Sequence, residues 1–330
     1  MLKIKLFFEM TKIWMEPMKV LVTGGAGFIG SNLARALWRQ GLQVVVIDNL
    51  LSGFKQNLSG MPEIDFIEGD IRDKNLLDQK MEDVQTIYHL AASVGNKRSI
   101  DNPILDADIN VMGTLCVLEA ARKHQVKKIV VTSSAGIFGE LKTLPIKEDH
   151  PIEPRTPYAS SKLYAEKISL AYADLYGIEA VCLRYFNVYG PHQRFDAYGN
   201  VIPIFVFKML QGETLQVYGD GEQTRDFVNV HDVVDANIQA ANTQGLSGAF
   251  NIASGKSITI NQLICELKQI FPNFPKVVYE APRAGDVRDS LADVSAAKKS
   301  FRYDPKVNLK EGLREYVEWA KSLLKEPEVL

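Results

Sequence analysis

The sequence contains few cysteines, no strong excess of charge of either sign and no long apolar run. Its three cysteines, Cys116, Cys182 and Cys265, are far apart and form no CxxC pair, so neither a disulfide framework nor a zinc site is indicated. The 38 basic residues nearly balance the 40 acidic ones, and the basic cluster at 123–128 is more typical of a solvated helix end than of a nucleic-acid patch. No apolar run approaches the length that spans a bilayer. We therefore expect a soluble cytoplasmic protein that binds neither membranes nor nucleic acid.

A chain of 330 residues, of which 46% are apolar, is long enough for one large domain or two. Residues 1–17 form a separate segment, in which Lys and Glu interrupt every apolar stretch, so a signal peptide is not indicated. Two interpretations of this segment stay open: it is an amphipathic extension, or it precedes a true start at Met18.

From Met18 onward, apolar runs alternate with amphipathic segments. The runs that we predict as strands are 19–23, 43–48, 64–70, 85–91, 127–134 and 179–186. Helices are predicted between most of them, for example at 29–41 and 110–124. Continuous Val/Ile runs separated by helices are typical of a parallel sheet that is covered on both faces. The predicted fold class is therefore α/β, with a Rossmann-like doubly wound parallel sheet.

After about residue 186 the pattern loosens, because Gly and Pro become frequent and the strands shorten. Helices are predicted here at about 231–243, 259–271 and 309–324. We predict a first domain over 18–186, completed by 228–255, and a smaller α+β substrate-binding lobe over 187–227 and 256–330. The lobe is expected over the carboxyl ends of the strands, where open α/β sheets bind ligands.

Three glycines, Gly24, Gly27 and Gly30, follow the first predicted strand and open the first predicted helix. In this context Gly24 allows a tight turn, Gly27 lets backbone N–H groups approach a pyrophosphate, and Gly30 lets the helix pack closely on the strand. Asp48 ends the second predicted strand, where an acid accepts hydrogen bonds from both ribose hydroxyls of a dinucleotide. No Arg stands beside Asp48 to hold a 2′-phosphate, so NAD is predicted as the cofactor rather than NADP.

Tyr158 and Lys162 are four residues apart on a predicted helix that begins after Pro157, so their side chains share one helix face. Beside a positively charged nicotinamide, Lys162 would lower the pKa of Tyr158 toward neutrality and make the phenol a general base. Ser134 ends a predicted strand and could share the same substrate hydroxyl and pass on its proton.

These motifs together resemble those of the extended short-chain dehydrogenase/reductases, specifically the nucleotide-sugar 4-epimerases. The resemblance covers nearly everything from Met18 to the C-terminal helix. Besides the glycines, Ser134 and the Tyr158–Lys162 pair, it rests on "GDIRD" at 69–73, "HLAA" at 89–92, "RYFNVYGP" at 184–191, "GDGEQTRDFV" at 219–228 and "RAGDVRDSLAD" at 283–293.

The resemblance implies a role for each matched residue, with Tyr158, Lys162 and Ser134 as the catalytic residues and no metal ion. The residues that it implies for NAD are Gly24, Gly27, Phe28, Ile29, Gly30, Asp48, Asn49, Asp70, Ile71, Leu90, Ala91, Asn110, Thr132, Tyr158, Lys162 and Tyr185. The residues that it implies for the UDP-sugar are Ser133, Ser134, Asn187, Asn200, Val201, Gln216, Tyr218, Arg225, Arg283, Asp286 and Ser290. A diphosphate needs permanently charged donors, which independently favours Arg225 and Arg283.

Ala135 and Gly136, directly after Ser134, discriminate between the reactions of similar enzymes. In the resembling 4,6-dehydratases an Asp–Glu pair stands there to move protons at C5 and C6, and the decarboxylases have a Glu nearby. A methyl group and a hydrogen can do neither, whereas an epimerase needs only hydride transfer, rotation of a 4-keto sugar and hydride return. We therefore predict an NAD-dependent UDP-hexose 4-epimerase.

Ser290 bears on the choice of sugar. In the resembling family a bulky Tyr at this position tends to accompany restriction to UDP-glucose and UDP-galactose, because its ring fills the space of an N-acetyl group. The small Ser290 thus predicts UDP-N-acetylglucosamine and UDP-N-acetylgalactosamine as substrates, with the plain hexoses also accepted. The alternative is that Ser290 caps a turn and that other loops close the pocket, which leaves a UDP-glucose 4-epimerase without N-acetyl activity.

Two further alternatives stay open. A UDP-glucuronate 4-epimerase would need a cation that faces the C6 carboxylate, for which Lys97, Arg98 or Arg194 are candidates. A non-catalytic NAD-binding regulator would keep the glycines but would have no reason to keep Tyr158 and Lys162 in register with Ser134.

The helices at about 101–124 and 158–176 carry apolar residues on more than one face, including Leu163, Ile168 and Leu175. The resemblance implies that they pair across a two-fold axis in a homodimer. Coverage of the second face by the chain's own N-terminal extension is the alternative.

Overall fold

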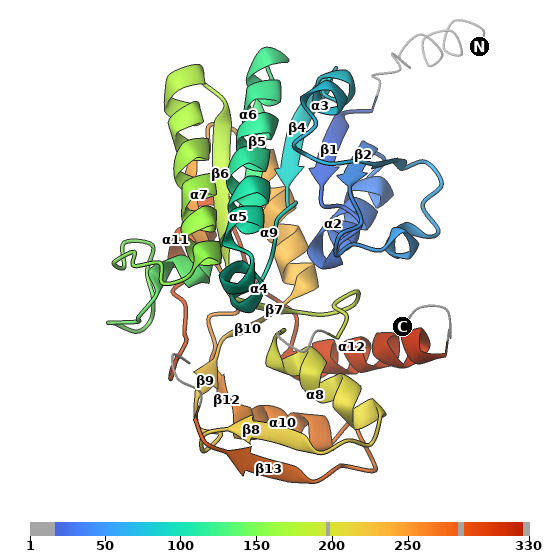
Figure 1. Cartoon of the computed structure of the whole chain (residues 1–330), viewed down its shortest axis with the longest axis vertical. Coiled ribbons are helices and arrows are strands. Elements are labelled where there is room, and N and C mark those ends of the chain that lie inside the picture. Colours follow the sequence, from blue (N-terminus) through green and yellow to red (C-terminus); the bar gives the residue numbers. More distant parts are fainter. Residues whose placement is uncertain (1–16, 196–198, 283–286, 326–330) are drawn as a thin grey trace, which may run out of the picture.

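Seven parallel strands form the central sheet of the computed structural model, which describes residues 17–195, 199–282 and 287–325. The predicted extension over 1–17 therefore lies outside the described residues except for Pro17. In spatial order the strands are β11 (Gly248–Ile252), β6 (Glu179–Tyr185), β5 (Lys128–Ser134), β4 (Val84–His89), β1 (Lys19–Thr23), β2 (Gln43–Asp48) and β3 (Asp65–Glu68). The chain winds outward in both directions from β1 (Figure 1), so the predicted Rossmann-like fold is confirmed.

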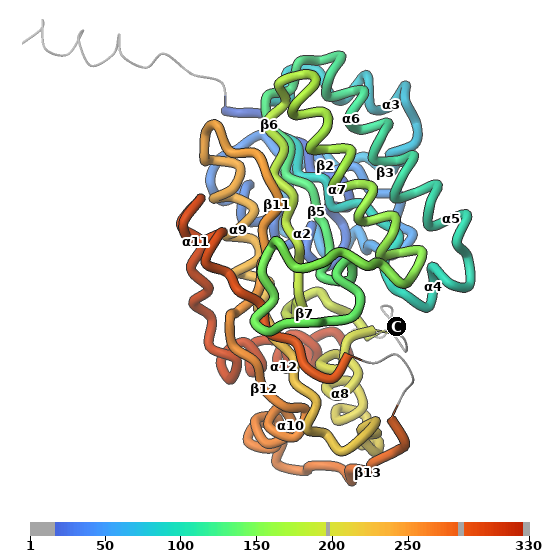
Figure 2. Tube along the Cα trace, turned by 90° about the vertical axis from the view of Figure 1, so that its left-hand side faces the viewer, coloured from blue at the N-terminus to red at the C-terminus, as the bar shows by residue number. Residues whose placement is uncertain are grey.

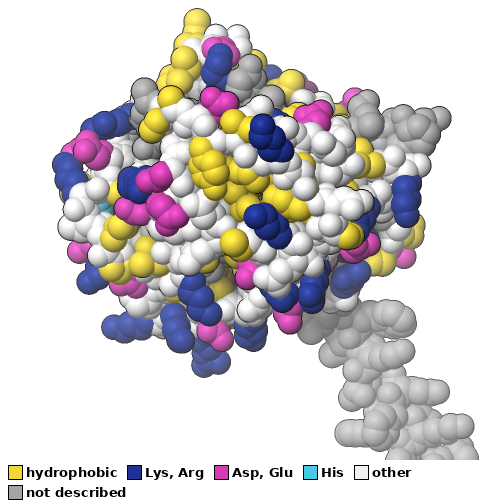
Figure 3. Space-filling view, turned by 90° about the horizontal axis from the view of Figure 1, so that it is seen from below, with side chains coloured by type: hydrophobic (Ala, Val, Ile, Leu, Met, Phe, Trp, Pro, Cys, Tyr) yellow, Lys and Arg dark blue, Asp and Glu magenta, His cyan; other side chains and the backbone are white. Residues whose placement is uncertain are grey.

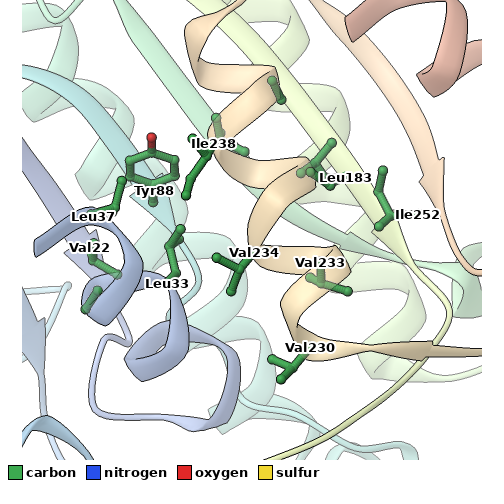
Figure 4. Close-up of a cluster of buried hydrophobic side chains, with 14 of the residues drawn as sticks. Val22, Leu33, Leu37, Tyr88, Leu183, Val230, Val233, Val234, Ile238 and Ile252 are labelled. Carbon is green, nitrogen blue, oxygen red and sulfur yellow. The ribbon is translucent and has the colours of Figure 1, made fainter. Parts of the chain in front are cut away.

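Helices cover both faces of this sheet, which is why its strands are nearly continuous Val/Ile runs. One face carries α2 (Phe28–Arg39), α9 (Val230–Asn242) and α11 (Ser295–Phe301), and the other carries α3 (Lys74–Lys80), α6 (Gly113–Lys123) and α7 (Pro157–Tyr176) (Figure 2). The core on the first face joins Val22, Leu33, Leu183 and Val233 from four elements (Figure 4). The predicted helices at 29–41, 158–176 and 231–243 thus match α2, α7 and α9 to within two residues.

The segment predicted as one helix over 101–124 is interrupted twice. Helix α4 (Asn96–Asp101) ends before α5 (Pro103–Ala107), because Asn102 takes a non-helical conformation ahead of the proline. A π-helical turn, η2 (Asp108–Met112), then separates α5 from α6. Such turns are rare and often occur at functional sites.

A smaller lobe lies below the carboxyl ends of the sheet strands (Figure 1). Its elements are β7 (Asn187–Tyr189), α8 (Val201–Leu210), β8 (Leu215–Tyr218), β9 (Thr224–Arg225), β10 (Phe227–Asn229), β12 (Ile258–Thr259), α10 (Ile260–Lys268), β13 (Val277–Glu280) and α12 (Leu309–Leu324). A separate cluster of buried side chains, from Ile202 and Phe205 to Leu313 and Tyr316, holds it together. The division of the chain at residues 186, 228 and 255 stays a prediction.

Helix α8 is an element that the sequence pattern did not predict. Its buried residues, Ile202, Phe205, Val206, Phe207 and Met209, point in several directions around the helix. A helix that is apolar on all sides is buried and has no amphipathic period, so a search for that period misses it.

The lower end of this lobe is formed by α10, β8 and β13, and hydrophobic side chains gather near the middle of that face with Lys and Arg around them (Figure 3). Tyr279 of β13 is among its exposed apolar residues. Over the described part of the chain, no helix is long and apolar enough to cross a membrane. The cytoplasmic location stays a prediction.

Candidate active site

The glycine turn lies between β1, β4 and α2 and is too crowded for side chains. Gly24 has a φ of +70°, and a Cβ there would lie 2.7 Å from the backbone nitrogen of Ala91. A Cβ on Gly30 would lie 2.1 Å from the carbonyl oxygen of Gly24. Gly27 is the N-cap of α2, and among the described residues no side chain caps this helix. The first N–H groups of α2, including those of Phe28 and Ile29, thus form a backbone cradle that fits a pyrophosphate.

Asp48 lies at the end of β2, directly beside this turn. Its side chain is only 7% exposed, and it accepts hydrogen bonds from the backbone N–H groups of Ala26 (2.9 Å) and Leu50 (2.8 Å). Burial raises the pKa of Asp48, while these N–H groups act in the opposite direction. An acid at this place fits the hydroxyls of an unphosphorylated ribose, and therefore NAD.

Asp70 and Asn49 lie side by side beyond the ends of β3 and β2. Asp70 accepts hydrogen bonds from Arg72 (2.7 and 2.8 Å) and from Asn49 Nδ2 (2.9 Å). The bonds from Arg72 lower the pKa of Asp70 far below its usual range, so the carboxylate stays ionised. Ile71 is buried against Gly113 of α6. The predicted contact of Asp70 and Ile71 with NAD stays a prediction.

Asn110, in the π-helical turn η2, fixes the loop that follows Leu90 and Ala91. Its Oδ1 accepts from the N–H of Ser93 (2.8 Å), and its Nδ2 donates to the carbonyl of Ser93 (3.0 Å) and to Ser161 Oγ of α7 (2.9 Å). The amide thereby joins three elements at the carboxyl edge of the sheet. This placement fits the prediction that Asn110 belongs to the NAD site.

The three predicted catalytic residues are close together. Tyr158 and Lys162 lie on one face of α7, and a hydrogen bond joins Tyr158 to Ser134 at the end of β5. Lys162 is only 3% exposed, and burial lowers its pKa to about 8. Over the described ranges, no carboxylate forms an ion pair with Lys162. The arrangement can hold a proton acceptor and a positive charge at one edge of the sheet.

The predicted lowering of the Tyr158 pKa does not follow from the protein groups alone. Burial raises the pKa of Tyr158 above its usual value, and the group that lowers it is Ser134 rather than Lys162. The predicted lowering included the positive charge of nicotinamide, which belongs to the cofactor and not to the protein. The protein groups alone therefore do not bring Tyr158 to neutrality.

Ser133 is not placed as predicted. Its hydroxyl is buried and donates to Glu166 of α7 (2.7 Å), on the face of the sheet that α6 and α7 cover. Because strand side chains alternate between faces, Ser133 points away from the side on which Ser134 lies. We correct this residue from a substrate contact to a buried link between β5 and α7.

Thr132 and Tyr185 lie at the end of neighbouring strands β5 and β6. The Tyr185 hydroxyl exchanges hydrogen bonds with the Asn237 side chain of α9 (2.7 and 3.0 Å), and both residues are buried. The hydroxyl is thus used inside the core. A contact of Thr132 or of the Tyr185 ring with NAD stays a prediction.

Apart from Ser133 and Ser134 of β5, the predicted UDP-sugar residues come from the smaller lobe. Asn187 donates to the carbonyl of Asp226 (3.1 Å), and Arg225 donates to the carbonyl of Thr224 (2.7 Å). Asn200 and Val201 begin α8, while Gln216 and Tyr218 lie on β8, where Lys208 donates to Gln216. Arg283 and Asp286 lie outside the described residues.

Ser290 is packed beside β9. It is 8% exposed, and its backbone N–H donates to Thr224 Oγ1 (3.3 Å). Strand β9, which carries Arg225, is thus in contact with the segment that carries Ser290. This places Ser290 next to one of the two arginines predicted for the diphosphate.

The cations considered for a carboxylated sugar are engaged with other groups. Lys97 pairs with Asp101 one turn along α4, at 2.5 and 2.6 Å. Arg194 lies over the ring of Phe54, 3.5 Å from its centroid, and donates to Gln56 (3.4 Å). Arg98 lies beside Lys97 on the same helix.

Sequence reasoning missed two buried polar groups behind the site. Glu166 pairs with Arg184, and His89 lies between Thr23 (2.8 Å) and Thr114 (3.1 Å). Burial and the charge of Lys162 lower the pKa of His89 to about 3, so this imidazole is neutral. A signal for Glu166 was present, because it follows Lys162 by four residues on a helix face that should be buried.

The glycine turn, Asp48 and the Tyr158–Lys162 pair define a dinucleotide-dependent enzyme with a doubly wound sheet. Residues 20–253 match the model of the NAD dependent epimerase/dehydratase family, and the chain belongs to this family. It is 42% identical over 306 residues to a putative UDP-glucose 4-epimerase from Methanocaldococcus jannaschii, with 92% of this chain and 98% of the relative covered.

Two solved structures are similar over nearly the whole chain. One is a UDP-glucose 4-epimerase with UDP-glucose from Thermotoga maritima, with a TM-score of 0.89, 40% identity, and 93% of this chain and 100% of the other covered. The other is a UDP-N-acetylglucosamine 4-epimerase from Methanobrevibacter ruminantium M1 in complex with UDP-N-acetylmuramic acid, with a TM-score of 0.89, 36% identity, and 93% and 99% covered. The predictions of the family, of the enzyme class and of NAD as cofactor are confirmed.

Proposed function

We propose that this protein interconverts UDP-N-acetylglucosamine and UDP-N-acetylgalactosamine, and also UDP-glucose and UDP-galactose, by epimerisation at C4. The observation that carries the reaction type is the composition of the wall beside Tyr158. Ser134 is followed by the short helix η3 (Ala135–Phe138), whose first two residues offer no acid or base. The site can move one proton at a hydroxyl, and it has no second pair of groups there for dehydration.

The chemistry divides between cofactor and chain. When bound, NAD would supply the hydride acceptor for oxidation at C4 of the sugar and the hydride donor for return to the opposite face. Tyr158 accepts the proton of the 4-hydroxyl through, or together with, Ser134, and gives it back when the hydride returns. With NAD bound, the buried charge of Lys162 would act together with the charge of the nicotinamide to stabilise the phenolate form of Tyr158. Ala135 and Gly136 leave the keto sugar free to turn between the two transfers.

NAD would be held by the backbone cradle of Gly24, Gly27 and Gly30, with Asp48 on its ribose hydroxyls and Asn110 beneath it. The UDP part would be held by the side chains that converge from the smaller lobe, among them Asn187 and Arg225. Arg283 and Asp286 are assigned to the same task on the strength of the sequence alone.

Ser290 carries the choice of the N-acetyl sugars. It is small, buried and adjacent to Arg225's strand, so it leaves room for an acetamido group at C2 that an aromatic ring would fill. The similar structures include one protein named for UDP-glucose and one named for UDP-N-acetylglucosamine, which suits a site that takes both. UDP-glucuronate is disfavoured because Lys97 and Arg194 already have other partners.

The test compares kcat/KM for both substrate pairs in the wild type and in Ser290→Tyr. We expect the wild type to turn over both pairs and the variant to lose the N-acetyl activity selectively. Equal loss on both pairs, or a wild type without N-acetyl activity, would contradict the role of Ser290. A wild type that is inactive on every UDP-hexose would contradict the proposed function itself.

A further inference from the structure

A buried carboxylate joins the helix and the strand that carry the catalytic residues. Glu166 of α7 is fully buried and accepts a hydrogen bond from Ser133 Oγ of β5 (2.7 Å). It also accepts two from Arg184 of β6, from Nε (2.9 Å) and Nη2 (2.8 Å). Ser133 and Arg184 are direct register partners in the sheet. The three side chains thus tie α7 to both strands at their carboxyl ends.

This link is close to the reacting groups on both sides. Along α7, Glu166 follows Tyr158 by eight residues and Lys162 by four, so all three side chains lie on one helix face. Along β5, Ser133 immediately precedes Ser134 and points to the opposite side of the strand. The position of Ser134 relative to Tyr158 is therefore set by how firmly β5 is held against α7.

The charges in this link are fully compensated. Burial works against an ionised Glu166, but the hydrogen bonds from Arg184 and Ser133 keep its pKa below the usual value, and Lys167 Nζ lies 3.7 Å away on the same helix. Arg184 also donates to the carbonyl of Glu148 (2.8 Å), and Cys182 donates to the carbonyl of Glu166 (3.6 Å). Buried bonds of this kind are short and rigid, and breaking one leaves a costly unpaired group.

We propose that Glu166, acting through Ser133, is a positioning residue that holds Ser134 in hydrogen-bond contact with Tyr158. This inference rests on the proposed function, in which that contact carries the proton. The groups that act on Tyr158 are Ser134 from β5 and the carboxylate of Asp106 from α5.

The sign of the expected effect follows from these groups. Ser134 lowers the pKa of Tyr158, whereas burial and Asp106 raise it. If β5 is released from α7, the contact with Ser134 weakens and the pKa of Tyr158 rises further. Because the base is the deprotonated phenol, the rising limb of kcat against pH then moves to higher pH.

The experiment uses two variants and a matched control. Ser133→Ala removes the hydrogen bond from β5 to Glu166 but leaves the Glu166–Arg184 pair. Glu166→Gln weakens the interactions with both Ser133 and Arg184. The control is Glu179→Gln, because Glu179 pairs with the buried Lys128 (2.7 Å) across the same two strands at their other end. We expect the rising limb to move to higher pH in the first two variants and to stay in place in the control. At a pH below the rising limb, kcat of these two variants should fall by up to the ~10²-fold that a misplacement of 1 Å can cost. Their KM should change little.

A readout independent of turnover is the titration of Tyr158 itself, followed by ¹³C NMR of tyrosines labelled at Cζ and assigned with Tyr158→Phe. We expect Tyr158 to titrate at higher pH in Ser133→Ala than in the wild type. If Glu166→Gln fails to fold, the titration and the pH profile of Ser133→Ala alone test the inference. An unchanged titration and an unchanged pH profile in Ser133→Ala would overturn the inference, even if that variant were less stable. A wild type without activity would contradict the proposed function. The titration of Tyr158 would still test whether Glu166 and Ser133 position Ser134.

Discussion

At Tyr158, opposing influences act on one phenol. Burial and Asp106 raise its pKa, and the hydrogen bond with Ser134 lowers it. Lys162, four residues on, is a buried cation whose pKa burial has brought to about 8, so it is protonated below that pH and loses its charge above it. With NAD bound, the site would therefore rely on Lys162 being charged when Tyr158 gives up its proton.

Replacing Tyr158 with Phe removes the group that accepts the proton of the 4-hydroxyl. We expect kcat to fall by the ~10²–10⁴-fold that is typical of losing a general base. Tyr176→Phe, the same change at the exposed far end of α7, is the matched control and should retain activity. Rates of epimerisation for the three proteins provide the measurement, and a Tyr158→Phe enzyme of near-normal rate would refute the mechanism.

At the scale of elements, helices α5 and α7 leave apolar side chains exposed on their outer sides. Ile104 of α5 is 85% exposed and Leu175 of α7 is 70% exposed, and Met112 of the turn between α5 and α6 is also open to solvent. Large exposed apolar patches mark interaction sites. We propose that a second copy of the chain covers this face around a two-fold axis.

Ile104→Glu should weaken this association, because it places a charge in an apolar contact. In sedimentation at micromolar concentration we expect the wild type to have twice the mass of one chain and the variant to shift toward a single chain. Tyr279→Glu, on the smaller lobe, serves as the control and should stay dimeric. A wild type of single-chain mass would contradict the proposal, and loss of the dimer on removing residues 1–17 would favour the N-terminal extension as the covering segment.

The sequence pattern was sufficient for six of the seven sheet strands and for most of the covering helices, but it did not predict the edge strand β11. Continuous Val/Ile runs fix the strands, and amphipathic periods fix α2, α9 and α12. The π-helical turn that carries Asn110 was not foreseeable, because its residues have no distinct pattern. Helix α8 was missed because it is apolar on all sides.

The sequence predicted those parts of the site whose residues lie close together along a single helix or turn. Tyr158, Lys162 and the glycine turn belong to single local motifs, so their arrangement follows from helix and turn geometry. Ser133 was misassigned because its partner, Glu166, is distant in sequence and meets it only through packing of α7 on β5. The alternation of strand side chains could have indicated that Ser133 and Ser134 point to different faces.

At the scale of the whole molecule, the proposed site draws on both lobes. The sheet lobe carries the glycine turn and the catalytic pair, and the smaller lobe carries Arg225 and Ser290. The loop between them is anchored on α2, where His192 bonds to Ser31 (2.7 Å) and Asn32 donates to the carbonyl of Pro191 (2.9 Å). These contacts hold the two lobes in register around the carboxyl edge of the sheet.

The central claim is that the wall formed by Ala135 and Gly136 restricts this site to epimerisation at C4. It is tested most directly with a UDP-hexose that carries deuterium at C4, turned over by the purified protein, and with the unlabelled sugar in heavy water. We predict that the C4 epimer forms with its C4 deuterium retained and that no solvent deuterium enters C5 or C6. Solvent deuterium at C5 or C6, or a 4-keto-6-deoxy product, would contradict the account.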